Sequence, residues 1–312
     1  MDSRLQNLSY SSLLTLHSCP RKWQLYRLNS VEEEVDENSP QVRSSNLTFA
    51  FGHAVGDGVQ LLLQGKSLDE VLFTLFTQWN CDYLEENPKQ NKSFPKALLA
   101  VQQFSEYISN GLLFEYELLY YNGKPACELG FRIHLPDGFK YRGFVDAVLR
   151  NKVTGEIMVL EVKTTSARYI SPAMYKNSAQ AIGYSIVLDA IAPDISSYKV
   201  LYLPYLTISS RFEPVEFNKS YVQRALWLQE LLLDIETIKM YDNIDIYPMR
   251  GESCNAFNRE CEYINLCTLS TANLVTPEPE TQRTEVFDIE ITFQELLAAQ
   301  LSKINSEEGV PV

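Results

Sequence analysis

Two consecutive apolar runs that end in charged side chains constrain the fold of this chain more than any other feature. The first run ends in Gly143-Phe-Val-Asp146, and the second ends in Leu160-Glu-Val-Lys163. Both runs have the composition of buried β-strands. Because successive side chains of a strand alternate between its two faces, Glu161 and Lys163 point the same way. The sequence therefore predicts two adjacent strands with a polar rim.

The charged rim has the composition of a phosphate-hydrolysing metal site. Two carboxylates, Asp146 and Glu161, suit a hard divalent cation such as Mg²⁺ or Mn²⁺, whose bound water would be the nucleophile. Lys163 would orient that water or stabilise the charge that grows on the phosphate oxygens. An Asp followed by Glu-x-Lys also occurs on the solvated faces of ordinary strands. The order of the motifs along the chain favours the functional interpretation.

Apolar periodicity and turn signals predict a mixed α/β chain. Helices are expected over 8–28, 50–64, 67–86, 95–113, 171–192, 218–241 and 292–304, and strands over 115–121, 126–135, 139–150, 156–163, 197–206 and 209–217. Strands that follow one another after a helical start, with a helix before the next strand, indicate a mixed sheet with helices on its faces.

A third motif extends the first two. Gln180-Ala-Ile-Gly-Tyr184 follows on the expected helix at 171–192, and residues four apart share one helix face. Together the motifs resemble the RecB-like branch of the PD-(D/E)XK nuclease superfamily, over residues 8–268. The resemblance implies a restriction-endonuclease-like αβββαβ core, with a helical N-terminal lobe. It also implies that the backbone carbonyl of Val162 binds metal, and that Gln180 and Tyr184 contact nucleic acid or support the catalytic lysine.

The upstream part of the chain departs from that family pattern. RecB-like nucleases carry Gly-x-x-x-His at the start of a helix, and here the stretch Gly52-His53-Ala-Val-Gly56-Asp57 places a glycine where the family has its histidine. His53 and Asp57 are alternative metal ligands, or else a capping or core histidine and a surface carboxylate. Glu128 is a third candidate ligand, because relatives often carry a glutamate on that strand. It could equally be an ordinary exposed strand residue.

One early cysteine and three late ones form a second constellation. Cys19 lies near the start of the chain, and Cys254, Cys261 and Cys267 lie within fourteen residues of one another. The arrangement resembles the iron-sulfur staple of RecB-like nucleases of the AddB and CRISPR-associated types, in which four thiolates hold a [4Fe–4S] cluster. The gap between Cys254 and Cys261 is wider than the family's Cys-x₂-Cys. Four thiolates also suit tetrahedral Zn²⁺.

The charge and hydropathy of the chain limit the kinds of partner that it can bind. The chain has 27 basic and 40 acidic residues, a formal net charge of −13, which is unusual for a protein that binds nucleic acid through phosphates. The acidic residues gather at 32–37 and after 277, so basic side chains near the predicted site could still form a local groove. The sequence contains neither a membrane-spanning apolar stretch nor a secretory signal, and we expect a cytoplasmic protein.

These observations predict one nuclease domain over 1–268 and a polar, acidic tail over 269–312. Within the domain we expect a helical lobe over 8–114, a catalytic core over 115–241 and a cysteine-bearing loop over 250–268. The predicted activity is Mg²⁺- or Mn²⁺-dependent hydrolysis of DNA, by analogy an exonuclease on single strands or DNA ends in recombination, repair or phage and CRISPR DNA processing. Two alternatives are a non-catalytic scaffold with the same fold, and a metal-stapled factor whose tail binds a protein partner.

Overall fold

The computed structural model describes residues 1–33, 47–79, 91–195, 197–256, 259–269, 280–283 and 287–308. Residues 34–37 of the acidic run lie outside these ranges. The chain divides into two compact units, which are described separately below. The first comprises Met1–Ser39, Gly130–Gly143 and Arg224–Ser306, and the second comprises Pro40–Leu129, Phe144–Gln223 and Glu307–Val312.

The second unit contains a mixed sheet. Its strands are β3 (Tyr116–Leu118), the later part of β7 (Lys140–Asn151), β8 (Ile157–Thr165), β9 (Ser197–Leu206), β10 (Arg211–Phe212) and β11 (Val215–Ser220). β7 pairs with β3 and β8 in antiparallel fashion, β8 pairs with β9 in parallel, and β9 pairs with β10 and β11 in antiparallel fashion. The expected α/β class with a mixed sheet and flanking helices is thus confirmed.

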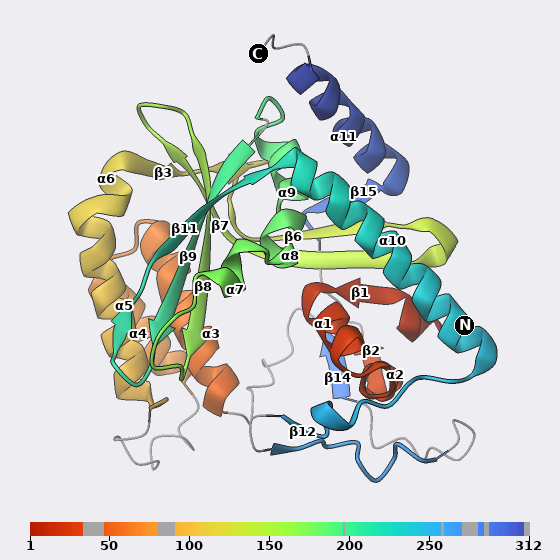
Figure 1. Ribbon diagram of the computed structural model, residues 1–312. Coiled ribbons are helices and arrows are strands. Elements are labelled where there is room, and N and C mark those ends of the chain that lie inside the picture. Colours follow the sequence, from red (N-terminus) through yellow and green to blue (C-terminus); the bar gives the residue numbers. More distant parts are fainter. Residues whose placement is uncertain are drawn as a thin grey trace. The chain divides into compact units, whose positions relative to one another are not determined.

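Three helices of the second unit cover one face of its sheet (Figure 1). They are α3 (Leu47–Leu63), α4 (Leu68–Gln78) and α5 (Phe94–Tyr107). Phe51 and Val55 of α3 belong to the same buried cluster as Leu160 of β8 and Leu203 of β9. Gly58 allows α3 to approach α5 closely, because a Cβ there would come within 2.4 Å of Val101. The apolar side chains of the strands thus point toward these helices, and the alternate side chains of β8 face the other way.

The remaining elements of the second unit are short. They are the π-helix Ile108–Leu112, α6 (Leu113–Glu115), β4 (Tyr120–Tyr121), β5 (Lys124–Pro125), the start of β6 (Cys127–His134), α7 (Ala173–Lys176), α8 (Ala179–Gly183) and α9 (Ser185–Ile191). The prediction of one continuous helix over 171–192 is wrong, because three short helices occupy that stretch. α7 ends at Asn177, whose φ of −105° and ψ of 16° leave the helical region.

The first unit is built on other parts of the chain. Its elements are β1 (Asn7–Ser9), α1 (Tyr10–Ser18), α2 (Pro20–Asn29), β2 (Ser30–Glu33), the end of β6, the start of β7, α10 (Tyr221–Ile244), β12 (Asn255–Ala256), β13 (Arg259–Glu260), β14 (Glu280–Arg283), β15 (Ile289–Thr292) and α11 (Phe293–Glu308). β1 runs parallel to β7, and β15 runs parallel to β6. Aromatic contacts between Tyr141 and Trp227, and between Trp23 and Tyr247, lie in its core.

The helix expected over 292–304 is present as α11, and it packs together with β15 on the first unit. β15 pairs with β6 along four residues, and α11 buries Leu296. The Arg224 guanidinium, itself buried, donates a 2.6 Å hydrogen bond to the Gln300 side chain on α11. A few apolar side chains at the right spacing are sufficient to dock this segment, although its overall composition is polar. Every helix among the described residues is too short or too polar to cross a membrane.

Candidate active site

The first two sequence motifs meet on β7 and β8 of the second unit. The antiparallel register pairs Ala147 with Leu160, which makes Asp146 and Glu161 the next cross-strand neighbours. Glu161 is fully buried. The Asp146 carboxylate accepts a 2.8 Å hydrogen bond on Oδ2 from the Val162 backbone N–H. The Val162 N–H would otherwise face the neighbouring strand. Its hydrogen bond to Asp146 fixes the Asp146 carboxylate beside Glu161.

The buried Glu161 carboxylate collects three donors. Its Oε1 accepts a 2.9 Å hydrogen bond from Gln180 Nε2 and forms an ion pair with Lys163 Nζ, while Oε2 accepts a short hydrogen bond from the Tyr184 hydroxyl. The expectation that Glu161 and Lys163 share one face is confirmed. Gln180 and Tyr184 both donate to the Glu161 carboxylate, although the expected helix is interrupted. They still share one side because Tyr184 keeps right-handed helical dihedral angles at the end of α8.

Burial and crowded negative charge raise the pKa of two groups here. The pKa of Asp146 lies well above its ordinary value, first because the carboxyl is removed from water and then because of the Glu161 charge, and Lys163 opposes the shift. Burial, followed by the same carboxylates, raises the pKa of the Tyr184 phenol. Tyr184 therefore keeps its proton and remains a hydrogen-bond donor to Glu161.

Glu128 joins the same group of carboxylates. It has a φ of 51° inside β6, in the left-handed region that non-glycine residues seldom adopt, and its neighbours Cys127 and Leu129 are both buried. The irregular strand turns the Glu128 side chain outward, as β-bulges beside active sites do. Although part of this side chain is exposed, desolvation raises its pKa, and the charges of Asp57 and Glu161 raise it further.

Helix α3 supplies the other wall of this group. Gln60 Nε2 donates a 2.8 Å hydrogen bond to Glu128 Oε1. Asp57, three residues earlier, has a pKa that burial raises and that nearby His53 lowers. His53 itself is exposed. Of the two alternative upstream ligands, Asp57 is thus the one that interacts with Glu128.

A small cavity lies where these elements meet. Its volume is about 20 Å³, and it is lined by Gly56, Val59, Gln60, Glu128, Asp146, Ala147, Leu160 and Val162. This volume is enough for one water-sized particle. A Cβ on Gly56 would meet no atom within 4 Å, so the glycine in the family's histidine position leaves room beside the carboxylates.

The two carboxylates in the lining are the oxygen ligands that a hard divalent cation of the Mg²⁺ type prefers. Such an ion binds proteins through one or two carboxylates and keeps several waters. Asp146 and Glu128 line the cavity, and burial raises the pKa of each carboxyl, with nearby carboxylates raising it further. Among the described residues, no three His, Cys, Asp or Glu side chains are arranged to hold a metal ion. The Glu161 carboxylate is instead engaged by Lys163, Gln180 and Tyr184.

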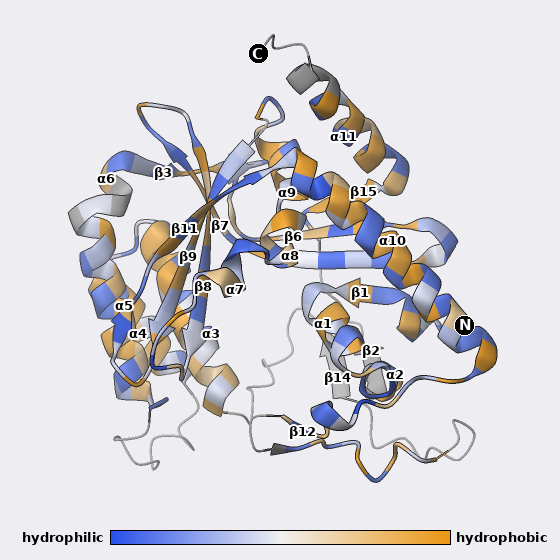
Figure 2. Ribbon diagram, in the orientation of Figure 1, coloured by the Kyte–Doolittle hydropathy of each residue, from blue (hydrophilic) through white to orange (hydrophobic). Residues whose placement is uncertain are grey.

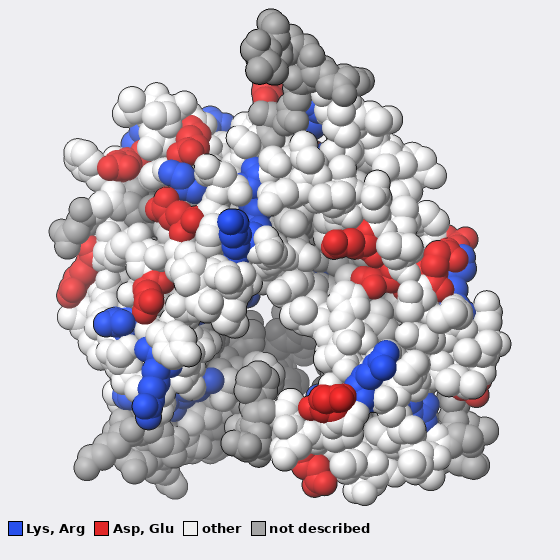
Figure 3. Space-filling model, in the orientation of Figure 1, with Lys and Arg blue, Asp and Glu red and all other residues white. Residues whose placement is uncertain are grey.

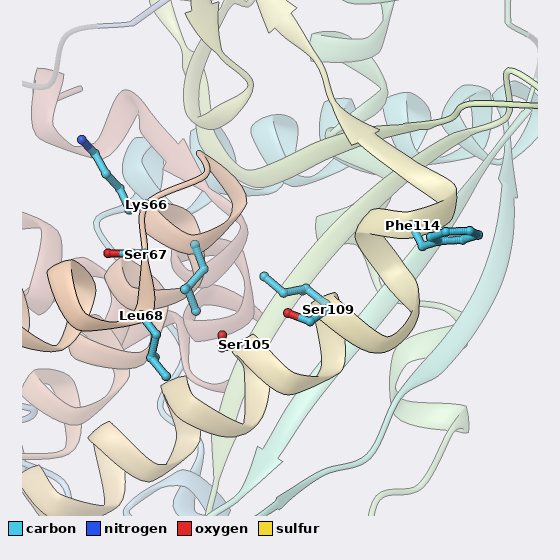
Figure 4. A pocket seen from close by; sticks show the side chains of 8 residues that line it. Lys66, Ser67, Leu68, Ser105, Ser109 and Phe114 are labelled. Carbon is cyan, nitrogen blue, oxygen red and sulfur yellow. The ribbon is translucent and has the colours of Figure 1, made fainter.

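A larger hollow on the same unit has a different character. About 460 Å³ in volume, it lies among α3, α4 and α5 and is lined by Leu62, Lys66, Ser67, Leu68, Ser105, Ile108, Ser109 and Phe114 (Figure 4). Its lining contains lysine and serine side chains but no carboxylate. The small cavity, with its carboxylates, is therefore the candidate active site.

Cys19, Cys254 and Cys261 lie near enough to Cys267 in the first unit to influence it electrostatically, although no three of these described cysteines are arranged to hold a metal ion. Their thiols interact electrostatically: burial raises the pKa of Cys267, and nearby Cys261, Cys19 and Cys254 raise it further. Cys19 is buried, the other three are partly buried, and none of the four forms a disulfide. Cys19 thus lies near cysteines that are 235 or more positions away from it in the sequence.

Contacts beside the cysteines fasten the two segments that carry them. Ser253 Oγ donates a 2.8 Å hydrogen bond to the Ser18 carbonyl, one residue before each cysteine. The Arg21 backbone N–H donates a 3.2 Å bond to the Pro248 carbonyl, and its guanidinium donates a 2.5 Å bond to the Leu269 carbonyl. These bonds hold the Cys19 segment against the cysteine-bearing loop without any contribution from the thiols.

Gln60 is the residue of this site that the sequence did not predict. It lies one helical turn after Gly56, on the face of α3 that carries the family's histidine position, and this spacing is the signal that could have identified it. A glutamine on a helix is usually an ordinary surface residue. Only the position of Glu128, which the irregular β6 determines, gives Gln60 its partner.

Comparison with known proteins places the chain in a family. Residues 7–268 match the family described as the PD-(D/E)XK nuclease superfamily. A solved structure of a candidate exonuclease from Eubacterium rectale is similar, with 13% identity, a TM-score of 0.46 and coverage of 81% of this chain and 87% of the other. A structure of the protein named SSO0001 shows 14% identity, a TM-score of 0.30 and coverage of 83% and 97%. A search of curated proteins found no significant match.

Proposed function

Because the chain belongs to the PD-(D/E)XK nuclease superfamily, we propose that it is a Mg²⁺- or Mn²⁺-dependent DNA nuclease that degrades single strands from their ends. The observation that carries this proposal is the convergence of Asp146, Glu161 and Lys163 on adjacent strands beside a small carboxylate-lined cavity. A scaffold protein that only binds a partner has no physical need for an ammonium paired with a buried carboxylate.

Each polar residue has a definite task in this proposal. Asp146 and Glu161, with the backbone carbonyl of Val162, would hold a divalent cation, and Glu128 and Asp57 are further oxygen donors next to it. When bound, the cation supplies Lewis acidity toward a phosphate oxygen and toward water. Lys163 stabilises the charge that develops on the scissile phosphate. Gln180 and Tyr184 position Glu161, so that its carboxylate keeps one orientation.

We also infer that Cys19, Cys254, Cys261 and Cys267 hold a structural [4Fe–4S] cluster, with Zn²⁺ as the alternative. The closeness of the four thiols supports this inference, together with the hydrogen bonds that fasten their two segments. Thiolates are the usual ligands of both groups. The cluster would link the start of the chain to the loop before residue 269, and an ultraviolet–visible spectrum of anaerobically purified protein with iron and zinc analysis distinguishes the two metals.

The decisive test is cleavage of an end-labelled single-stranded DNA with Mn²⁺ by protein purified without oxygen. We expect wild-type cleavage to fall at least about a thousandfold in Glu161→Gln and Lys163→Ala, because each change removes charge used in the transition state. Glu117→Gln, which alters an exposed carboxylate on β3, is the matched control and should remain active. Activity that persists in both site variants, or no wild-type activity on any DNA, would refute the catalytic proposal in favour of the scaffold.

A circular single-stranded DNA distinguishes exonuclease from endonuclease activity. A circular single strand has no end, so an exonuclease leaves it intact while it degrades the linear form. Cleavage of the circle, lost again in Glu161→Gln, would keep the nuclease and replace the exonuclease with an endonuclease. The same series with single-stranded RNA decides between DNA and RNA as the substrate.

A further inference from the structure

The long helix α10 carries an apolar stripe on its outer side. Five exposed residues of this helix are large and apolar, with between 52% and 67% of each side chain accessible: Val222, Leu226, Leu233, Met240 and Ile244. They are separated by steps of four and seven residues, and such steps return to nearly the same face of an α-helix. The five side chains, named here the α10 stripe, therefore form one line along the helix.

The α10 stripe is separate from the face of α10 that packs in the core. Trp227, Leu231, Ile235 and Ile238 of the opposite face are buried. The other exposed residues of the helix, Gln229, Glu230, Glu236 and Asn243, are polar and border the stripe. Orange positions recur along α10 in Figure 2, and acidic side chains lie among uncharged surface along its course in Figure 3. An amphipathic helix needs one apolar face, so the second one is available for a partner.

The size of the stripe fits a protein interface. Five side chains of this kind, each more than half exposed, present roughly 500 Å² of apolar surface, which is the size of patch that marks interaction sites. With the bordering polar side chains, the buried area would approach the roughly 800 Å² that each partner contributes to a standard interface. Thr237 lies beside the stripe, and its hydroxyl donates a 2.8 Å hydrogen bond to the Leu233 carbonyl of the same helix. This polar group is therefore already satisfied and needs no partner at an apolar interface.

The spacing of the stripe identifies the partner. The steps of four, seven, seven and four residues read the same in both directions, with Leu233 at the centre. When two such helices lie antiparallel with a two-fold axis at Leu233, Val222 packs against Ile244 of the partner subunit and Leu226 against Met240 of the partner subunit. A two-fold interface uses one self-complementary surface twice, which this symmetric pattern provides. We propose that a second copy of this chain covers the α10 stripe, and that the two α10 helices pair in antiparallel orientation about Leu233.

The charges that border the stripe are compatible with the antiparallel orientation. In the antiparallel pair, Glu236 faces Gln229 of the partner subunit, whose amide can donate to the carboxylate. The Glu230 carboxylates are offset along the axis by six residues, about 9 Å at 1.5 Å per residue. The helix dipoles also oppose one another in this arrangement.

Sedimentation equilibrium of the full-length protein tests the proposal. The wild type, with a chain mass of 35.7 kDa, should sediment as a dimer at micromolar concentration in about 0.15 M salt, where the net charge of each copy is largely screened. Leu233→Glu places two charges on the two-fold axis and should raise the dissociation constant at least a hundredfold. Phe73→Glu makes the same change at an exposed position of α4, outside the stripe, and should remain dimeric. Far-ultraviolet circular dichroism verifies that both variants are folded.

Cysteine cross-linking tests the orientation. Leu233→Cys should form an intersubunit disulfide under mild oxidation, above the background that the native cysteines give in the wild type. Leu226→Cys should not, since its two copies would lie about 21 Å apart along an antiparallel pair. A wild type that is monomeric, a dimer that Leu233→Glu leaves intact, or equal cross-linking at both positions would overturn the proposal. DNA cleavage plays no part in these measurements, so they stand apart from the proposed nuclease activity.

Discussion

The two groups of candidate metal ligands differ in what holds them together. In the carboxylate site, the ligands themselves take part in the structure: the buried Glu161 accepts hydrogen bonds from Gln180 and Tyr184, and Asp146 accepts one from the Val162 backbone. In the cysteine cluster, neighbouring groups such as Ser253 and Arg21 hold the segments, and the thiols form no disulfide.

This difference separates two uses of a metal. The carboxylate site is already ordered by protein contacts, so the proposed cation would add chemistry and relieve repulsion among like charges. The cysteine segments are held by a few partly exposed hydrogen bonds, so the proposed metal there would add stability. Loss of the cation should consequently affect cleavage much more than folding, whereas loss of the cluster should affect folding first. The predictions below, from the largest expected effect to the smallest, test this contrast.

The largest effect on stability is expected from Cys261→Ser. If a cluster links the four thiols, removal of one ligand should lower the free energy of unfolding by several kcal/mol, because metal binding contributes directly to folding. Urea unfolding of anaerobic protein measures the effect. Cys127→Ser, a buried cysteine on β6 outside the cluster, is the control and should cost only about 1 kcal/mol. Equal losses in the two variants would show that the cluster is not a structural support.

Tyr184→Phe should reduce cleavage about tenfold to a hundredfold with little effect on stability. The change removes the phenol donor from Glu161 but keeps the ring, so the carboxylate loses one of the contacts that fix its orientation. The rate at saturating Mn²⁺, compared with the Mn²⁺ concentration needed for half activity, shows whether Glu161 loses reactivity or affinity for the metal. Tyr221→Phe alters another buried phenol and should leave both quantities unchanged. An unaltered Tyr184→Phe enzyme would mean that Gln180 and Lys163 are sufficient to position Glu161.

Gly56→His should lower the Mn²⁺ concentration for half activity about threefold to tenfold. The open space beside Gly56 accepts a side chain, and an imidazole there would lie at the edge of the cavity that Asp146 and Glu128 line. Gly56→Leu adds comparable bulk without a ligand and is the matched control. A gain in both variants would indicate a packing effect rather than metal binding.

The smallest effect is expected at His17, which pairs with Asp234 at 2.8 Å on the surface of the first unit. The hydrogen bond to Asp234 raises the pKa of His17 above its ordinary 6.5. The pair therefore contributes its full stability below pH 6.5 and loses it as the pH rises through the folded-state pKa. Because the histidine is more than half exposed, His17→Gln should cost only a few tenths of a kcal/mol at pH 6 and nothing at pH 9. Thermal unfolding at both pH values measures the difference.

The central strands could be predicted from the sequence, and the helix after them could not. Apolar residues predominate in 156–163 and 197–206, and β8 and β9 occupy these ranges almost without change, because a strand in the middle of a sheet with covered faces is largely apolar. The expected helix over 171–192 contains the same kind of apolar spacing, but the chain forms three short helices there, and the first of them ends before Asn177, whose dihedral angles leave the helical region. Short helices that pack against a sheet depend on tertiary contacts, which periodicity does not report.

By itself the sequence determined the fold class and the chemical types at both clusters, because strand alternation and residue spacing are local properties. It placed Glu161 and Lys163 on one face, and it grouped Cys254, Cys261 and Cys267. Only the tertiary structure decided the partners: the register that sets Asp146 beside Glu161, the left-handed Glu128 that meets Gln60, and the approach of Cys19 to the late cysteines. Contacts between residues far apart in the chain depend on how whole elements pack, and no short stretch of sequence contains that information.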